Sequence, residues 1–321
     1  MMRKKYFHPS LRVVTLSISL VAALVSITAC SQTKIEITKS NQSTNSIQAI
    51  KDSQANETEK AVEETEVIVE NTLEAINGRD KIVIGVKTDY TPFGFIDSDG
   101  ENAGLEIDIA RRITEEVLDS EEKVEFVPVT ALNRIDLLKQ GKIDLVIATM
   151  TDTEERRQEI DFSENYYSSG VGVLTKKGNG IKTWEDLKGK TVCGIEGAFY
   201  NEELTEMKIE MVNFSQTSGA YKSLQEGLCV GFAYDELGLV GKIQDPEWSQ
   251  NWHQPLEPIL QKSWGMGVRK GNEQFLTTVN DAILDMEAEG FIVEGEKKWN
   301  IPPTEYAEER MEQAKAKVDN N

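Results

Sequence analysis

The chain is poor in the residues that build metal sites and nucleic-acid interfaces. Among its 321 residues are two histidines and three cysteines, and they show no spacing typical of metal ligands. Acidic residues number 55 against 35 lysines and arginines, giving a net charge of -20, and no basic stripe occurs. We therefore expect no metal site and no nucleic-acid binding. Any site for an anion must create its own local positive field.

The one long apolar run lies near the N-terminus and has the pattern of an export signal. Basic residues within residues 3–12 precede an apolar run at residues 13–28, too short for a comfortable membrane span of ~20 residues. The run ends in Ile27-Thr28-Ala29-Cys30, which resembles the bacterial lipobox. We expect residues 1–29 to be a lipoprotein signal peptide, with an acylated Cys30 anchoring the protein outside the cytoplasmic membrane. The alternative is an ordinary signal peptide with a chance cysteine.

Two segments lack the composition of a packed domain. Residues 30–78 are rich in Ser, Thr, Asn, Gln and Glu, so they cannot bury enough surface to offset their ordering entropy, and we expect a disordered tether. Residues 303–321 are charged and are expected to form a helical or frayed C-terminal tail. The folded part between them is long enough for one large domain or two of ordinary size.

Expected strands and helices alternate through this folded part. Alternation predicts parallel sheets. Extended crossings at 170–174 and 264–268 flank the second series and predict two α/β lobes joined by two strands. Lobe 1 would comprise residues 79–168 and 264–302, and lobe 2 residues 169–263. Strands are expected at 81–86, 124–128, 143–148, 191–195, 210–214 and 230–234, and helices at 106–118, 133–140, 183–189, 201–207, 220–226 and 274–289.

Two cysteines remain if Cys30 is lipidated. Cys193 lies in one expected strand of lobe 2, and Cys229 opens the apolar run of another. Two thiols in an exported protein are more often bridged than free, and adjacent strands would allow a bridge. Two separate buried thiols are the alternative.

The segment after residue 148 has the pattern of a carboxylate receptor. Thr151 and Glu154 have the capping-box spacing of a new helix, and Arg156 lies one turn inside it. A guanidinium beside threonine hydroxyls and a helix N-terminus, at the carboxyl end of a strand, suits a carboxylate. The alternative is that Arg156 pairs with Glu155 or Glu159 on a solvated face.

Several segments of the folded part together form a specific set of motifs. They are Tyr90-Thr91-Pro92-Phe93-Gly94-Phe95, Gly104-Leu105-Glu106-Ile107-Asp108-Ile109-Ala110, Gly141-Lys142-Ile143-Asp144, Met150 to Arg156, Ile160-Asp161-Phe162-Ser163 with Tyr166-Tyr167, Asp186 to Lys190, and Tyr234-Asp235. On these motifs, residues 80–302 resemble the family 3 extracellular solute-binding proteins of bacterial ABC importers, which carry polar amino acids. The resemblance implies a type II periplasmic-binding-protein fold, whose two lobes close on one small-molecule ligand. It implies no catalysis and no cofactor, a monomer, and a partner formed by ABC permease subunits with a cytoplasmic ATPase.

The resemblance also implies roles for single residues. Arg156 and Thr151 would hold the ligand α-carboxylate, and Asp235 with Thr149 would hold the α-ammonium group. Tyr90 would cover one side of the ligand. Asp235 could instead cap the next helix, and Tyr90 could belong to the core.

This chain departs from the family pattern at four positions. Ala198 and Phe199 follow Gly197 where many members place Thr or Ser, which leaves only backbone N–H groups to contact the ligand there. Ala131 stands where many members have a pocket aromatic. Lys87 stands where many members have Asp.

Lys87 and Arg134 look like the cations of the glutamate- and aspartate-binding branch of the family. With Arg156 they would make three cations against one acid, which suits a ligand with two carboxylates and one ammonium group. We therefore expect L-glutamate or L-aspartate, unless Lys87 or Arg134 points to solvent. Alternatives are glutamine or another polar amino acid, a cyclohexadienyl-type dehydratase with Glu196 as general acid, and the ectodomain of a sensory receptor.

Overall fold

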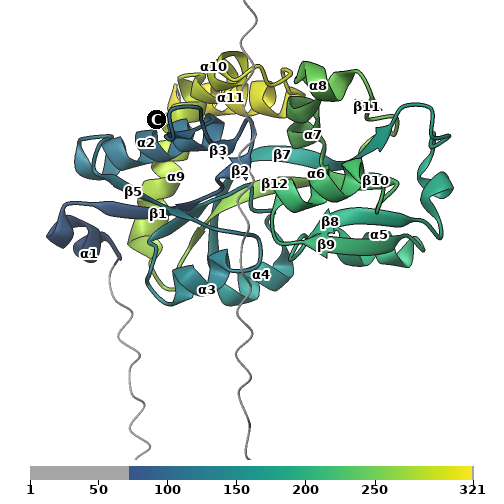
Figure 1. Cartoon of the computed structure of the whole chain (residues 1–321). Helices are drawn as coiled ribbons and strands as arrows, with labels where there is room; N and C mark the ends of the chain where they lie inside the picture. The colour runs from purple at the N-terminus through teal and green to yellow at the C-terminus, as the bar shows by residue number, and fades with distance from the viewer. Residues whose placement is uncertain (1–71, 320–321) are drawn as a thin grey trace, which may run out of the picture. The chain divides into compact units, whose positions relative to one another are not determined.

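The computed structural model describes residues 72–319. The expected signal peptide, Cys30 and most of the expected tether lie outside these residues. Within them, two α/β lobes share one sheet (Figure 1). No helix between residues 72 and 319 is both long and apolar enough to cross a bilayer.

Lobe 1 is built on three parallel strands in the order β5-β1-β6. Their apolar side chains are buried between helices on both faces, as expected for a parallel sheet. The strands are β1 (Ile82–Val86), β5 (Val124–Pro128) and β6 (Leu145–Ile147), and the helices include α2 (Leu105–Leu118), α3 (Arg134–Lys139), α4 (Glu154–Glu159), α9 (Glu273–Ala288) and α10 (Phe291–Lys298). A small antiparallel sheet beside them consists of β2 (Asp89–Tyr90), β3 (Gly94–Ile96) and β4 (Asn102–Ala103).

Lobe 2 repeats the plan with the parallel strands β10-β8-β9. Its strands are β8 (Thr191–Ile195), β9 (Glu210–Phe214) and β10 (Gly231–Asp235), and the short β11 (Trp252–His253) is added at the side. Its helical elements are η1 (Trp184–Leu187), α5 (Asn201–Glu206), α6 (Thr217–Gln225), α7 (Glu236–Ile243) and α8 (Pro246–Ser249).

Two long antiparallel strands connect the lobes. β7 (Asp161–Lys176) pairs with β12 (Ile259–Val268) and, farther along, with β10 of lobe 2, while β12 also pairs with β6 of lobe 1. The predicted pair of α/β lobes joined by two strands is therefore confirmed. The expected lobe boundaries at 168/169 and 263/264 fall inside these two strands.

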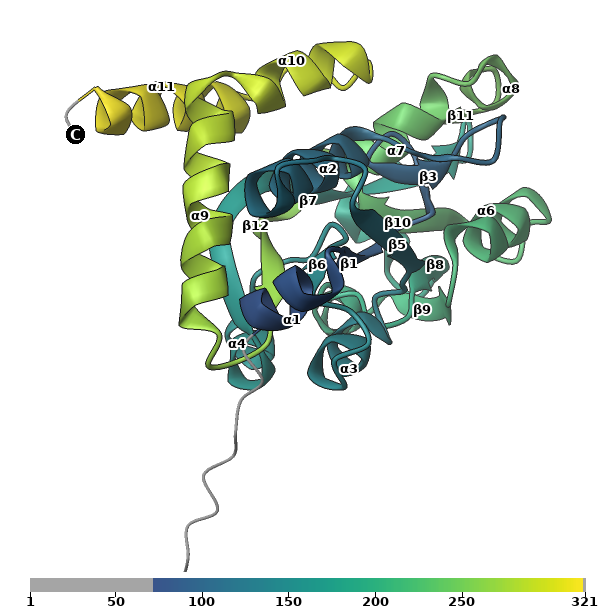
Figure 2. The same ribbon diagram turned by 90° about the vertical axis from the view of Figure 1, so that its left-hand side faces the viewer.

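The ends of the described chain both pack on lobe 1. The expected tail is a helix, α11 (Glu305–Val318), which lies with α10 across one end of α9 (Figure 2). Arg310 on α11 pairs with the buried Glu287 of α9, Nε to Oε1 2.7 Å. The phenol of Tyr306 donates to the carbonyl of Asn165 on β7.

The expected tether ends earlier than residue 78. Residues from Thr72 onward form α1 (Thr72–Arg79), so the prediction of disorder is wrong for 72–78. The Thr72 amide and hydroxyl both donate to Asn272 Oδ1, at 2.9 and 2.8 Å, and Ile76 is fully buried. Composition alone misses these contacts because their partners lie about two hundred residues away in lobe 1.

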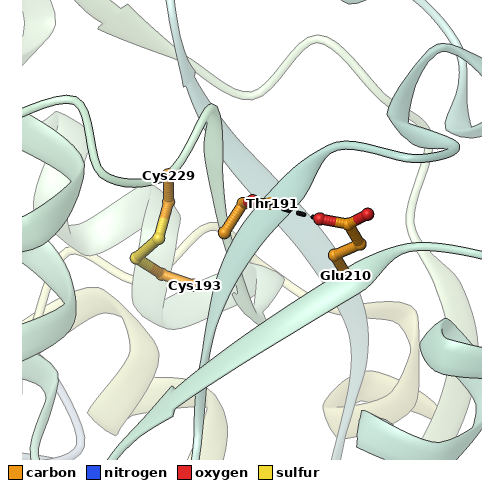
Figure 3. Close-up of a disulfide and its surroundings, with 4 residues drawn as sticks. All are labelled: Thr191, Cys193, Glu210 and Cys229. Atoms are coloured by element: carbon orange, nitrogen blue, oxygen red, sulfur yellow. Dashed lines mark hydrogen bonds between the residues drawn. A yellow bond between two sulfur atoms is a disulfide. The ribbon is translucent and has the colours of Figure 1, made fainter.

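The two cysteines of lobe 2 form a disulfide. Cys193 on β8 is bonded to Cys229, which precedes β10, with the two Cα atoms 5.6 Å apart (Figure 3). This confirms the bridge and excludes separate thiols. On the neighbouring strands the Thr191 hydroxyl donates to Glu210 at 3.4 Å.

Candidate ligand-binding cleft

A cavity lies between the lobes at the carboxyl ends of their parallel strands. It is partly open to solvent. Every predicted ligand-binding residue except Tyr90 lines it. Lobe 1 contributes Lys87, Ala131, Arg134, Thr149, Thr151 and Arg156, and lobe 2 contributes Ile195, Ala198, Phe199, Tyr200, Tyr234 and Asp235.

Arg156 reaches across the cleft from the first turn of α4. Its Nη1 donates to the Thr151 carbonyl at 2.7 Å, and its Nη2 donates to the Gly197 carbonyl of lobe 2 at 3.1 Å. Burial lowers the pKa of Arg156, but a guanidinium remains charged at neutral pH. The alternative partner Glu159 is instead paired with Lys139, Nζ to Oε2 2.6 Å.

The expected capping box at Thr151 is wrong by two residues. The N-cap of α4 is Thr153, whose hydroxyl accepts from the Arg156 amide at 3.3 Å. Thr151 is extended and forms an isolated antiparallel bridge with Trp264 of β12. Because Thr151 pairs with a distant strand, the helix begins two residues later than the local pattern predicts. Thr151 nevertheless lines the cavity.

Arg134 is buried at the start of α3, so it does not point to solvent. Its side chain is 4% exposed, and its Nη1 donates to the Ala148 carbonyl at 2.6 Å. Its Nε has no hydrogen-bond partner among the described residues. Burial lowers the pKa of Arg134 to about 9, with a further contribution from the positive charge of Arg156.

Lys87 is also buried, but it already has an anionic partner. Its Nζ lies 3.1 Å from Asp89 Oδ1, and Asp89 Oδ2 accepts from the Thr217 amide of lobe 2 at 2.9 Å. Burial opposes ionisation of Asp89, but Lys87 and the Thr217 hydrogen bonds outweigh it and lower the pKa of the carboxyl. The cavity lining does hold the expected three cations and one acid, but the expectation omitted Asp89, which lies outside the lining and already pairs with Lys87. The pairing of Lys87 with Asp89 could have been predicted from the sequence, because residues i and i+2 of an extended segment lie on the same face.

Asp235 is the last residue of β10 in lobe 2, and it faces the three cations of lobe 1. It is the residue before α7, yet its side chain makes no capping hydrogen bond, which excludes the capping alternative. Burial raises the pKa of Asp235 to about 6, although the Tyr90 phenol and the charges of Arg134, Lys87 and Arg156 lower it. The carboxylate is thus placed to receive a positively charged group.

Tyr90 stands behind the cavity rather than in its lining. Its ring packs on Tyr234 at 4.8 Å between centroids, and also on Phe93 and Trp264. The core alternative is therefore correct for the ring, and the expectation that Tyr90 covers the ligand is not supported. Its buried phenol lies close enough to Asp235 to lower the pKa of that carboxyl. A Cβ at Gly238 would collide with this ring, so α7 can pack here only with glycine at that position.

The loop after β8 brings backbone close to the cleft. Gly197 has φ +73°, and an added Cβ would lie 3.2 Å from the Ala131 backbone of lobe 1. Ala198 and Phe199 line the cavity, but the Ala198 amide donates to the Ile195 carbonyl at 3.2 Å. That N–H group is therefore not free for a ligand, contrary to expectation. Glu196, the possible general acid, does not line the cavity.

A fully buried carboxylate lies next to the cleft and was missed as a functional residue. Glu106, in the first turn of α2, accepts at Oε1 from the Thr149 amide at 2.6 Å and from the Tyr166 phenol. Burial raises the pKa of Glu106 to about 7, although these two hydrogen bonds and the charges of Arg134 and Lys87 lower it. Glu106 lies within one of the family motifs, but its partners Thr149 and Tyr166 are distant in the sequence and could not be predicted from it.

Comparison with known proteins agrees with this geometry. Residues 82–302 match the family described as bacterial extracellular solute-binding proteins, family 3. The ABC transporter glutamine-binding protein GlnH of Bacillus subtilis (strain 168) is 36% identical over 233 residues, covering 71% of this chain and 84% of that protein. The glutamate/aspartate import solute-binding protein of Escherichia coli (strain K12) is 29% identical over 247 residues, covering 73% and 82%.

Solved structures share the fold as well. An ancestral arginine-binding protein bound to glutamine has a TM-score of 0.64 at 33% identity, covering 69% of this chain and 98% of that one. Together with the observed topology, this confirms the predicted α/β type II periplasmic-binding-protein fold.

Proposed function

This chain belongs to the bacterial extracellular solute-binding proteins of family 3, and on that premise we propose that its cleft binds L-glutamine. The broader role is that of a non-enzymatic, extracytoplasmic receptor which supplies a polar amino acid to an ABC importer. The observation that carries the glutamine proposal is the charge balance around the cavity. Its three cations, Lys87, Arg134 and Arg156, are matched by three buried or half-buried acids, Asp89, Asp235 and Glu106.

A zwitterion with a neutral polar side chain suits this balance. Arg156 would bind the α-carboxylate, and Asp235 on the opposite lobe would bind the α-ammonium group. Lys87 and Arg134, which only donate hydrogen bonds, would reach the side-chain carbonyl oxygen. The glutamine-binding relative at 36% identity and the glutamine-bound ancestral protein support the same ligand.

L-Glutamate is the second candidate, and L-aspartate follows it. Two donor-only cations in the cavity lining also suit a carboxylate, as first expected from Lys87 and Arg134. The relative that imports glutamate and aspartate supports this reading at lower identity. Whether Arg134 carries uncompensated charge depends on Glu106.

Calorimetric titration of the ligand-free protein with glutamine, glutamate, aspartate and arginine tests the proposal. We expect glutamine to bind one-to-one most tightly at mildly alkaline pH, glutamate next, and arginine not at all, because a basic side chain would meet Lys87 and Arg134. Tightest binding of arginine or aspartate would refute the choice of ligand. If none of the four binds, the whole polar-amino-acid assignment of this cleft fails.

Variants of the two side-chain cations assign their roles. Lys87→Met and Arg134→Met keep much of the side-chain bulk but remove the charge. Loss of one partner of a desolvated ion pair costs about 3–5 kcal/mol, so glutamate should weaken by roughly a hundredfold or more. Glutamine has no side-chain charge and should weaken much less. Equal losses for both ligands would show that these residues shape the cleft without acting on ligand charge.

We also propose that Cys30 is lipidated, so that the receptor is held at the membrane beside its permease as a monomer. The supporting observation is the lipobox-like segment that ends at Cys30. Mass spectrometry of the membrane fraction should find an acylated Cys30 at the mature N-terminus. Cys30→Ala should release the protein; retention of the variant on the membrane would exclude the lipid as the anchor.

A further inference from the structure

Glu106 and Arg134 hold the two sides of a single peptide group. The carbonyl of Ala148 accepts from Arg134 Nη1 at 2.6 Å, and the N–H of Thr149, in the same peptide group, donates to Glu106 Oε1 at 2.6 Å. Arg134 lines the cavity, whereas Glu106 lies behind it. A carboxylate outside the site is thus linked through one peptide group to a cation inside it.

The linked peptide is held in an unusual conformation. Thr149 has φ +46°, which is rare for a β-branched residue and is maintained only where the surroundings impose it. Thr149 also lines the cavity. The two hydrogen bonds to this peptide group therefore position a site residue as well as linking the two charges.

The groups that act most strongly on Glu106 are hydrogen-bond donors and cations. The charged and titratable groups that face it are Arg134 on α3 and Lys87 after β1, the phenol of Tyr166 on β7 and that of Tyr90 on β2. Its second oxygen, Oε2, has no hydrogen-bond partner among residues 72–319. An acid with one satisfied and one orphaned oxygen can exist in either protonation state without losing its hydrogen bonds to Thr149 and Tyr166.

We propose that Glu106 determines whether the cleft prefers a side-chain amide or a side-chain carboxylate. When Glu106 is ionised, it compensates Arg134, the cavity is balanced and glutamine is preferred. When Glu106 is protonated, Arg134 is left with an uncompensated charge, and glutamate supplies the missing anion. This inference rests on the proposed function, since it concerns the ligand of the same cleft.

The two states should interconvert near neutral pH. Because burial raises the pKa of Glu106 to about 7, the affinity for glutamine relative to glutamate should rise as pH increases through that value. Asp235, with a pKa raised by burial to about 6, binds the α-ammonium group common to both ligands, so its titration cancels in their ratio. Asp89 stays ionised throughout, because its pKa is lowered.

The experiment measures the ratio of glutamate to glutamine dissociation constants by calorimetry across the pH range that brackets the Glu106 pKa. For the unmodified protein we expect this ratio to rise by tenfold or more as the pH increases. A difference of one unit in the Glu106 pKa between the two ligand complexes corresponds to a tenfold change in relative affinity. Titrations in buffers of different ionisation enthalpy should show net proton uptake with glutamate and less with glutamine. A flat ratio, with both ligands bound, would overturn the inference while leaving the proposed function intact.

Two variants separate the charge of Glu106 from its structural role. Glu106→Gln keeps an acceptor for Thr149 and Tyr166 but removes the charge, so it should favour glutamate at every pH and flatten the ratio. Tyr166→Phe removes a hydrogen bond that lowers the Glu106 pKa, so the midpoint should move to higher pH. It remains informative if Glu106→Gln does not fold. An unchanged midpoint in Tyr166→Phe, or a pH-dependent ratio in a folded Glu106→Gln, would refute the proposal.

Discussion

The two walls of the cleft are built from the same kind of strand end but carry opposite charge. In lobe 1, residues that follow β1 and β6 or begin α3 and α4 supply every cation of the cavity lining. In lobe 2, the ends of β8 and β10 supply one acid, Asp235, among apolar and aromatic side chains. In the proposed binding mode, the two charged ends of an amino acid would contact different lobes, so a bound zwitterion would bridge them.

The lobes also differ in what stabilises each of them. Helices from both ends of the described chain, α1 and α11, pack on lobe 1. Lobe 2 is smaller and has the Cys193–Cys229 disulfide instead. A small unit buries a lower fraction of its surface, so a covalent link matters more there.

Removing Arg156 should have the largest effect on binding, because we propose that Arg156 binds the ligand α-carboxylate from lobe 1. Arg156→Ala leaves the α-carboxylate unpaired and also loses the hydrogen bond to Gly197 of lobe 2. At about 3–5 kcal/mol, the loss should exceed a hundredfold for glutamine and glutamate alike, measured by calorimetry. Arg156→Lys, which keeps the charge but not the two-pronged geometry, should recover part of the affinity. Undiminished binding by Arg156→Ala would place the α-carboxylate elsewhere.

Removing the disulfide should be the next largest effect, and it should appear in stability. Cys193 and Cys229 are 36 residues apart, and closing such a loop stabilises the fold by about 3–4 kcal/mol. For a body of this size, the Cys193→Ala/Cys229→Ala protein should melt roughly 10 °C lower by calorimetry. Thr191→Val, which removes one exposed hydrogen bond on the same strand, is the matched control and should change little. Equal melting of the double variant and the parent would show that lobe 2 does not depend on the bridge.

The parts of the fold that local pattern could determine were predicted closely. The strands at 124–128, 191–195 and 210–214 have the expected bounds. The crossing strands were underestimated. Residues 170–174 were expected to be extended, but β7 runs from Asp161 to Lys176, because pairing with β12 stabilises its polar residues in the sheet.

The sequence predicted the cations of the cavity lining but not the acidic residues that lie close to them. Lys87, Arg134 and Arg156 stand out as basic residues placed against the family pattern or after strand ends. Asp89 and Glu106 were missed as counter-charges, since pairing depends on which side chains the fold brings together. Tyr90 was misplaced because aromatic identity does not distinguish a cavity wall from the packed layer behind it.

Removing the acid of lobe 2 should have an effect of intermediate size and a pH signature. Asp235→Asn keeps a hydrogen-bond acceptor but loses the charge, for about 2–3 kcal/mol, or about a hundredfold in affinity for both ligands. The pKa of Asp235 is raised by burial to about 6, and only the ionised form pairs with an ammonium group. Binding of both ligands should therefore weaken as pH falls below that value. The variant should lose this shared dependence; its persistence in Asp235→Asn would assign the titration to another group.

The smallest expected effect concerns a direct contact between the walls. Thr217 of lobe 2 donates through its hydroxyl to the Asp89 carbonyl of lobe 1 at 2.8 Å and to the Asp89 carboxylate at 3.2 Å. We expect these bonds to be lost when the lobes open, and a ligand that bridges the lobes to favour the closed form. We expect the hinge at Gly170-Val171-Gly172 in β7 and Gly265-Met266-Gly267 in β12, because glycine lets a few residues absorb the dihedral change of closure.

Thr217→Val removes the hydroxyl but keeps the amide that bonds Asp89 Oδ2, so it should destabilise the closed form by about 1 kcal/mol. Affinity for glutamine and glutamate should fall by the same factor, about fivefold, because the Lys87–Asp89 pair is retained. Small-angle scattering should show a smaller radius of gyration with ligand, and the variant should need more ligand to reach it. Thr205→Val is the control, since the Thr205 hydroxyl bonds only its own helix, at the Asn201 carbonyl. If the two variants bind alike, the contact between Thr217 and Asp89 adds nothing to closure; a loss confined to glutamate would mean that Thr217 acts on the side-chain end of the ligand through Lys87.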